Sequence, residues 1–134
     1  MSKYSYDVGK DTNAISLMAD VDTVGLAASR ASVIDLVATD PARAVAHSVN
    51  ATGDIAEQEI GGAKTLKNKQ LSILTKIDLI GDEESNEKEC KRISVKYYLD
   101  GGKDGYLYFD DPLKVVADDF STVFLLMQID LIAE

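Results

Sequence analysis

Residues that could act as nucleophiles or general bases are scarce in this sequence. It contains one histidine, His47, and one cysteine, Cys90. Nucleophilic hydrolysis needs a base beside the nucleophile and donors that stabilise the oxyanion, and the sequence has no Gly-x-Ser-x-Gly elbow. The cations Lys88, Lys91 and Arg92 would lower the pKa of Cys90, but a thiol enzyme also needs an oriented histidine. We therefore expect no catalytic residues and interpret both side chains as incidental.

Metal and nucleotide sites are also poorly supported. Zinc and redox metals need clusters of cysteine and histidine, and neither glycine pair, Gly61-Gly62 or Gly101-Gly102, continues into a phosphate-binding motif. Paired carboxylates would suffice for a hydrolase with a carboxylate-only site, which stays a remote alternative because the chain has no tryptophan on which a sugar could stack. No cofactor is expected.

Calcium is the one inorganic ligand that the sequence permits. The segment Asp100–Asp111 overlays a twelve-residue calcium loop, with acids at positions 1, 5 and 12, glycine at 6 and an apolar residue at 8. Position 3 is glycine, position 12 is a short aspartate, and the preceding residues look like a strand instead of a helix. We expect a glycine-rich β-hairpin whose weak calcium candidates are Asp100, Asp104 and Asp111.

Tyrosines are concentrated around this hairpin. Six of the nine aromatic residues are tyrosines, and a tyrosine at an interface buries a large ring while keeping a polar tip. We consider two interpretations: the rings line the edge of the core, or they form a protein interface. The interface candidates are Tyr98, Tyr106 and Tyr108.

The elements that must position these residues are strands. Apolar residues alternate with polar ones in Gln70–Ile80, Arg92–Leu99 and Thr122–Ile132, which is typical of strands with one buried face. The last run is also apolar on its other face, at Phe124, Leu126 and Ile132. Either a helix predicted over Pro112–Phe120 covers that face, or the face contacts another protein. The apolar positions predicted to fill the core are Ile73, Ile77, Leu79, Val95, Leu99, Leu125, Met127, Ile129 and Leu131.

Weaker patterns predict the remaining elements. A strand is expected over Asn13–Val21, and Thr23–Ala38 is ambiguous between helix and strand, with strand favoured for Ser32–Ala38. The Asp-Pro pairs at 40–41 and 111–112 predict short helices, the first over Asp40–Ala46. The other expectations are a turn at Asp54–Glu59, a charged loop at Gly81–Lys91 and a hairpin turn at Asp100–Gly105 that leads into Tyr106–Phe109.

Length and charge complete the prediction. A chain of 134 residues forms one domain over residues 1–134. Its net charge of −9 argues against nucleic acid, and it has neither an apolar run of ~20 residues to span a membrane nor a secretory signal. One cysteine fits a reducing compartment, so we expect a cytoplasmic protein.

The predicted fold is mostly β: a β-sandwich or open barrel of antiparallel strands with one or two short helices. The leading functional hypothesis is a non-catalytic module that binds a protein partner or forms a homo-oligomer. The alternatives are a small-ligand or calcium-binding β-sandwich and an acidic inhibitor or immunity-type protein for a basic partner, since a charge of −9 would steer such an association.

Overall fold

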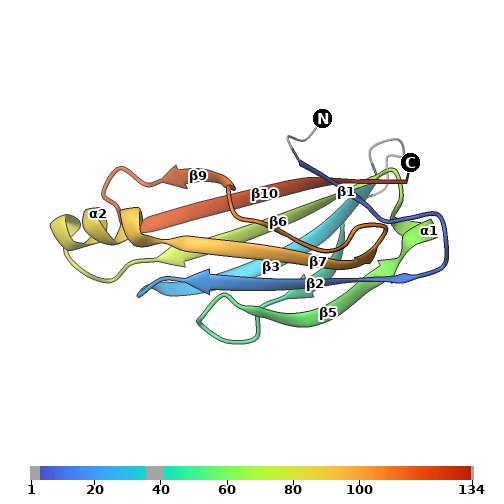
Figure 1. Ribbon diagram of the computed structural model, residues 1–134. Helices are drawn as coiled ribbons and strands as arrows, with labels where there is room; N and C mark the ends of the chain where they lie inside the picture. Colours follow the sequence, from blue (N-terminus) through green and yellow to red (C-terminus); the bar gives the residue numbers. More distant parts are fainter. Residues whose placement is uncertain (1–3, 36–40, 134) are drawn as a thin grey trace.

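The fold consists mainly of two β-sheets packed face to face (Figure 1). The structure is a computed structural model that describes residues 4–35 and 41–133. The six-stranded sheet, called sheet A, has the order β1-β10-β6-β3-β4, and β9 also pairs with β10. The four-stranded sheet, called sheet B, has the order β5-β2-β7-β8. All neighbours are antiparallel except β1 and β10, and the sheets do not close into a barrel.

The strand and helix bounds follow the chain. The strands are β1 (Tyr4–Asp7), β2 (Ala14–Asp22), β3 (Leu26–Asp35), β4 (Arg43–His47), β5 (Ile55–Gly62), β6 (Lys69–Asp78), β7 (Ser94–Gly102), β8 (Gly105–Phe109), β9 (Leu113–Val116) and β10 (Thr122–Ile132). Two short helices are described, α1 (Ala63–Leu66) and α2 (Glu83–Arg92), and they lie at opposite ends of the sandwich (Figure 1). The predicted β-sandwich with one or two short helices is confirmed.

The alternating runs form the centre of both sheets, as predicted. Gln70–Ile80 contains all of β6 except its first residue, Arg92–Leu99 contains most of β7, and Thr122–Ile132 is β10. All nine predicted core residues are buried. The predicted strand Asn13–Val21 matches β2 to within one residue at each end. Within Thr23–Ala38 the chain forms a strand, β3, from Leu26 to Asp35, and residues 36–38 lie outside the described part of the chain.

Two predicted helices and a predicted turn are instead strands. In Asp40–Ala46, of which Asp40 is not described, the chain enters β4 at Arg43, and the backbone of this strand hydrogen-bonds to β3. Asp54–Glu59 enters β5, which pairs with β2. Pro112–Phe120 contains β9, which pairs with β10 and extends sheet A at its edge. In each case cross-strand pairing overrides a weak local signal for helix or turn.

A helix replaces the loop predicted at Gly81–Lys91. Asp82 caps α2 by accepting a hydrogen bond at 2.8 Å from the backbone N–H of Ser85, and the hydrogen bonds from Ser85 lower the pKa of Asp82. The side chain of Asn86 ties the helix to the end of β6, because its amide donates to the carbonyls of Leu79 and Gly81 and accepts from the N–H of Gly81. Only Asn86 and Cys90 of this helix are buried.

A chain of three buried hydroxyl groups connects the two sheets through the core. The Ser29 Oγ of β3 lies 2.9 Å from the Thr75 Oγ1 of β6, which lies 2.8 Å from the phenol oxygen of Tyr97 in β7. Burial raises the pKa of Tyr97 to about 12, and the hydrogen bond with Thr75 offsets part of that rise. The polar groups are therefore paired where an unpaired one would be costly.

Hydrogen bonds and ring contacts also join the sheets at both sides. On one side the hydroxyl of Tyr6 accepts from the N–H of Gly102 and donates to the carbonyl of Gly105. A Cβ on Gly102 would lie 2.7 Å from the Tyr6 ring, so the close approach needs glycine there. On the other side the Gln58 amide of β5 donates to the carbonyl of Val45 in β4.

We expect Ile77→Ala to lower the free energy of unfolding by about 2–5 kcal/mol, because Ile77 is fully buried and its removal leaves a cavity. Urea denaturation monitored by circular dichroism measures the change. Leu74→Ala on the exposed face of the same strand is the control and should cost far less. Equal losses for both variants would contradict the packing described above.

Tyr97→Phe should cost about 1 kcal/mol at neutral pH by removing one buried hydrogen bond. The raised pKa of Tyr97 also makes stability depend on pH. The neutral phenol is favoured in the folded state, so this contribution is complete below pH ~10 and decreases by up to about 3 kcal/mol as pH rises towards ~12. Denaturation between pH 9 and 12 should therefore show a shallower loss in Tyr97→Phe than in the wild type.

Candidate protein-binding surfaces

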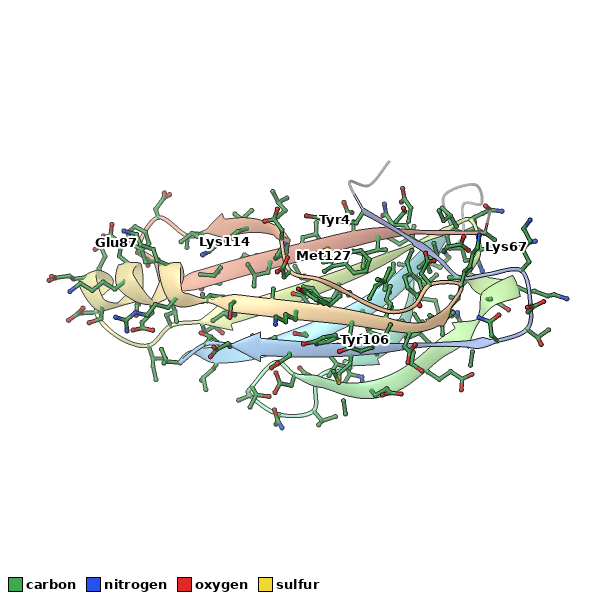
Figure 2. All side chains as sticks on the ribbon, viewed as in Figure 1. Tyr4, Lys67, Glu87, Tyr106, Lys114 and Met127 are labelled. Carbon is green, nitrogen blue, oxygen red and sulfur yellow. The ribbon has the colours of Figure 1, made fainter. Side chains whose placement is uncertain are left out.

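The three predicted interface tyrosines form one cluster on the outer face of sheet B. Tyr98 lies opposite Tyr108 in the β7–β8 hairpin, and its ring stacks on that of Tyr106 with 5.2 Å between centroids. The Tyr108 ring lies 6.0 Å from Tyr98. Tyr106 and Tyr108 are 56% and 53% exposed, and Figure 2 shows Tyr106 over this sheet. We call Tyr98, Tyr106 and Tyr108 the tyrosine cluster.

Charged groups surround the tyrosine cluster. The Lys96 ammonium lies 5.2 Å from the centroid of the Tyr108 ring, a cation–π contact. The pKa of Tyr106 is raised, first by desolvation and then by its neighbour Tyr98 and the carboxylates of Asp100 and Glu57. Two carboxylates therefore act on the cluster, and the Lys96 ammonium contacts one of its rings.

A hollow of about 450 Å³ opens beside the cluster, between β2 and the loop that precedes β5. Met18, which lines it, is the cross-strand partner of Tyr98. Asp20, Val49 and Ala56 line other parts of the same hollow. We call it the Met18 hollow. It and the tyrosine cluster form one continuous stretch of the sheet B surface.

The predicted candidates Phe124 and Leu126 lie on the opposite side of the sandwich, on the outer face of sheet A. Leu126 pairs with Leu74 on β6 and with Leu113 on β9, and Phe124 pairs with Val115. Because directly paired residues point to the same face of a sheet, these side chains form one group. We call it the sheet A patch: Leu74, Leu113, Val115, Phe124 and Leu126.

The sheet A patch is open to solvent. Leu113 and Val115 are 64% and 54% exposed, and Leu74 and Phe124 are also exposed. The helix predicted over Pro112–Phe120 would have covered this face, but β9 lies beside β10 within the sheet. Ile132 is not part of the patch: it lies at the far end of β10, half-buried opposite Asp7 of β1.

Sequence reasoning missed three members of the sheet A patch. Leu74 is the one apolar residue on the outward parity of β6 within Leu71–Ile77, and this break in the alternation was a usable signal. Leu113 and Val115 belong to a segment whose apolar spacing also fits a helix, so only the pairing with β10 reveals them. Met18 and Val49 gave no signal, because a loop distant in sequence forms the hollow.

The calcium candidates lie on a β-hairpin, as expected. Asp100 ends the regular part of β7 and accepts from the N–H of Gly101, Asp104 lies in the turn, and Asp111 follows β8. No group of three acidic, histidine or cysteine side chains in residues 4–35 and 41–133 is placed to hold a metal. The five-residue strand β8 separates Asp104 from Asp111, so the three acids do not converge.

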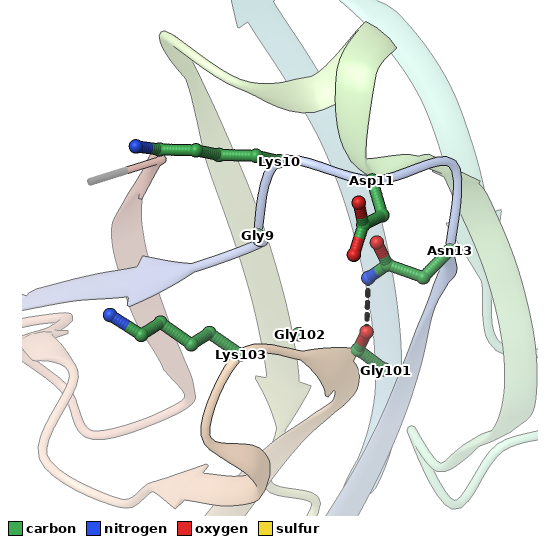
Figure 3. Close-up of a pocket in the computed structure, with 7 residues that line it drawn as sticks. All are labelled: Gly9, Lys10, Asp11, Asn13, Gly101, Gly102 and Lys103. Carbon is green, nitrogen blue, oxygen red and sulfur yellow. Dashed lines mark hydrogen bonds between the residues drawn. The ribbon is translucent and has the colours of Figure 1, made fainter.

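A second hollow, of about 320 Å³, lies where the hairpin turn meets the loop after β1 (Figure 3). Lys10 and Lys103 lie at its rim, and the Asn13 amide donates to the carbonyls of Val8 and Gly101. The nearby backbone N–H groups of Gly9, Gly102 and Lys103 already have acceptors within the protein. They are not available to bind an anion.

The two residues considered for nucleophilic catalysis lie apart. His47 is exposed on β4, at an edge of sheet A, whereas Cys90 is buried in α2. Burial raises the pKa of the Cys90 thiol, and the Lys114 ammonium, which donates to the Cys90 carbonyl, offsets only part of that rise. The lowering expected from Lys88, Lys91 and Arg92 does not occur.

No protein-family model, curated protein or solved structure matches this chain. The helices found in the described residues are too short and too polar to cross a membrane.

Calorimetric titration with calcium should show no binding tighter than about 10⁻⁴ M, which is weaker than sensor EF-hands, because Asp100, Asp104 and Asp111 do not converge. The control is Asp104→Asn, which should give the same trace as the wild type. A micromolar constant that Asp104→Asn abolishes would overturn this interpretation of the hairpin.

Proposed function

We propose that this protein is a non-catalytic assembly module that associates through the sheet A patch, and that its first partner is a second copy of the same chain. The observation that supports the proposal is the patch itself: five adjacent apolar side chains on one sheet face, four of them exposed. Large exposed apolar patches on soluble proteins commonly mark interaction sites.

The gain from covering such a patch is substantial. Burying apolar surface is worth about 25 cal/mol per Å², so a patch of a few hundred Å² contributes several kcal/mol before the costs of association. A stable interface buries roughly 800 Å² on each partner. The apolar patch would therefore form the centre of the interface, and polar residues of sheet A such as Arg30 and Gln128 would form its rim.

The register of sheet A makes the patch compatible with two-fold symmetry. In a symmetric dimer the same surface occurs on both sides of the interface, so it must be complementary to itself. Leu126 pairs with Leu74, and Phe124 pairs with Lys76, on the neighbouring strands β10 and β6. Consider a two-fold axis that lies in the interface plane, above the sheet, parallel to β10 and β6 and midway between them. This axis would place Leu126 of one copy over Leu74 of the other, and Phe124 over Lys76. Both contacts are favourable.

The compartment is part of the proposal. The chain contains one cysteine, which is buried and free, and a protein that needs no disulfide suits a reducing environment. We propose the cytoplasm as the place where the assembly forms.

The test of self-association is sedimentation velocity over a range of protein concentrations. We expect a concentration-dependent dimer that is strengthened by salt, because two copies of charge −9 repel each other and salt screens that repulsion. Leu113→Lys should weaken dimerisation by at least tenfold. Leu113, Leu126, Leu74 and Arg30 follow one another across the sheet, so the two-fold axis would place the new ammonium over the guanidinium of Arg30 in the other copy, a contact between like charges.

Ile80→Lys is the matched control. Ile80 is 81% exposed and lies outside the patch, so this variant makes the same change in charge and should dimerise like the wild type. A protein that stays monomeric at high concentration and in salt would refute the homotypic proposal. Equal effects of the two substitutions would show that net charge, and not the patch, controls association.

A further inference from the structure

The outer face of sheet B is independent of the proposed dimer surface, because it lies on the other side of the sandwich (Figure 1). On this face the tyrosine cluster supplies aromatic rings and the Met18 hollow supplies an apolar depression. We propose that this face binds a segment of a basic protein, with lysine or arginine side chains over the rings of Tyr98 and Tyr106 and an apolar side chain in the Met18 hollow.

Charge favours a cationic occupant. Asp20 lines the hollow, Asp100 follows Tyr98 in β7 by two residues on the same face, and the net charge of the chain is −9. Tyrosine rings attract cations through their faces, and the carboxylates add a Coulombic attraction that also steers the encounter. An acidic segment would meet repulsion from the same groups.

Lys96 supports this choice from within the protein. Its ammonium contacts the Tyr108 ring at 5.2 Å, so one ring of the cluster already binds a cation. Tyr106, whose ring stacks on Tyr98, is the most exposed ring of the cluster. Removing the lysine would free the Tyr108 ring for the partner as well. The proposal thus predicts that loss of the Tyr106 ring weakens binding of the basic segment and that loss of the Lys96 ammonium strengthens it.

The Met18 hollow determines which kind of residue lies next to the lysine or arginine in the bound segment. Met18 is flexible and polarisable and adapts to different apolar side chains, and Val49, which also lines the hollow, is 84% exposed. Met18 pairs directly with Tyr98, so the hollow adjoins the rings. In the bound segment, the apolar residue in the hollow would therefore be one or two positions along the chain from the lysine or arginine over the rings. The recognised segment therefore carries an apolar residue close to its lysine or arginine.

The probe for this proposal is a synthetic glycine-spaced peptide that contains arginines and one leucine. Amide NMR shifts of the labelled full chain, recorded during titration, report both the affinity and the residues contacted. We expect shifts along β2, β7 and β8, and at least fivefold weaker binding when glutamine replaces the arginines. The peptide with alanine in place of leucine should also bind more weakly.

Two variants test the rings. Tyr106→Ser should weaken binding of the arginine peptide two- to fivefold, which is the expected size of one exposed cation–π contact. Lys96→Met should tighten it by a similar factor. Lys67→Met, at an exposed residue at the end of α1 that belongs to neither proposed surface, is the matched control, because it changes net charge equally and should have a smaller effect.

Several results would overturn the proposal: unchanged binding by Tyr106→Ser, equal binding of the glutamine peptide, or shifts confined to α2 or to the acidic turn at 118–119. Leu113→Lys separates this proposal from the assembly proposal. The variant should lose dimerisation and still bind the peptide, so each surface can fail without the other.

Discussion

The buried hydroxyl chain from Ser29 through Thr75 to Tyr97 constrains the alignment of the whole sandwich. Each group is buried and satisfied only if β3, β6 and β7 keep their registers, because a slip by one residue would turn the side chain outwards and leave its partner unpaired in the core. The register that buries Tyr97 also points Tyr98 and Lys96 to solvent, and the one that buries Thr75 exposes Leu74 and Lys76. Both candidate surfaces are therefore consequences of the core.

The centre of the fold could be predicted because its strands have one buried face. In β6, β7 and β10 the alternation extends over eight or more residues, and only a strand places every second side chain on one face. The same alternation identified Phe124 and Leu126 as apolar residues on the outer face. The hairpin at 100–105 was also predictable, because Gly101, Gly102 and Gly105 favour a turn there, and two of them have positive φ angles in the structure.

The edges of the sheets could not be predicted in this way. Strand β9 has only four residues, and the apolar spacing from Leu113 to Phe120 fits a helix as well as a strand, so pairing with β10 decides the outcome. Helix α2 was missed for a different reason: it buries only Asn86 and Cys90 and therefore has no apolar face to detect. The sequence signal for α2 was the N-cap residue Asp82, and an aspartate at such a position is also common in loops. The sheet A patch depends on β9, so its full extent was hidden with it.

The two proposed surfaces have a joint consequence because they lie on opposite sides of one sandwich. If two copies pack through the sheet A patch, both tyrosine clusters face away from the interface, and the dimer presents two sites for a basic partner. Partners that carry several basic segments would then bind through both sites, and the second contact would form at a high effective concentration. A weak site on each copy, as expected for exposed tyrosine rings, would then give a much higher avidity. Assembly through sheet A would therefore determine how strongly sheet B binds, although the two surfaces share no residue.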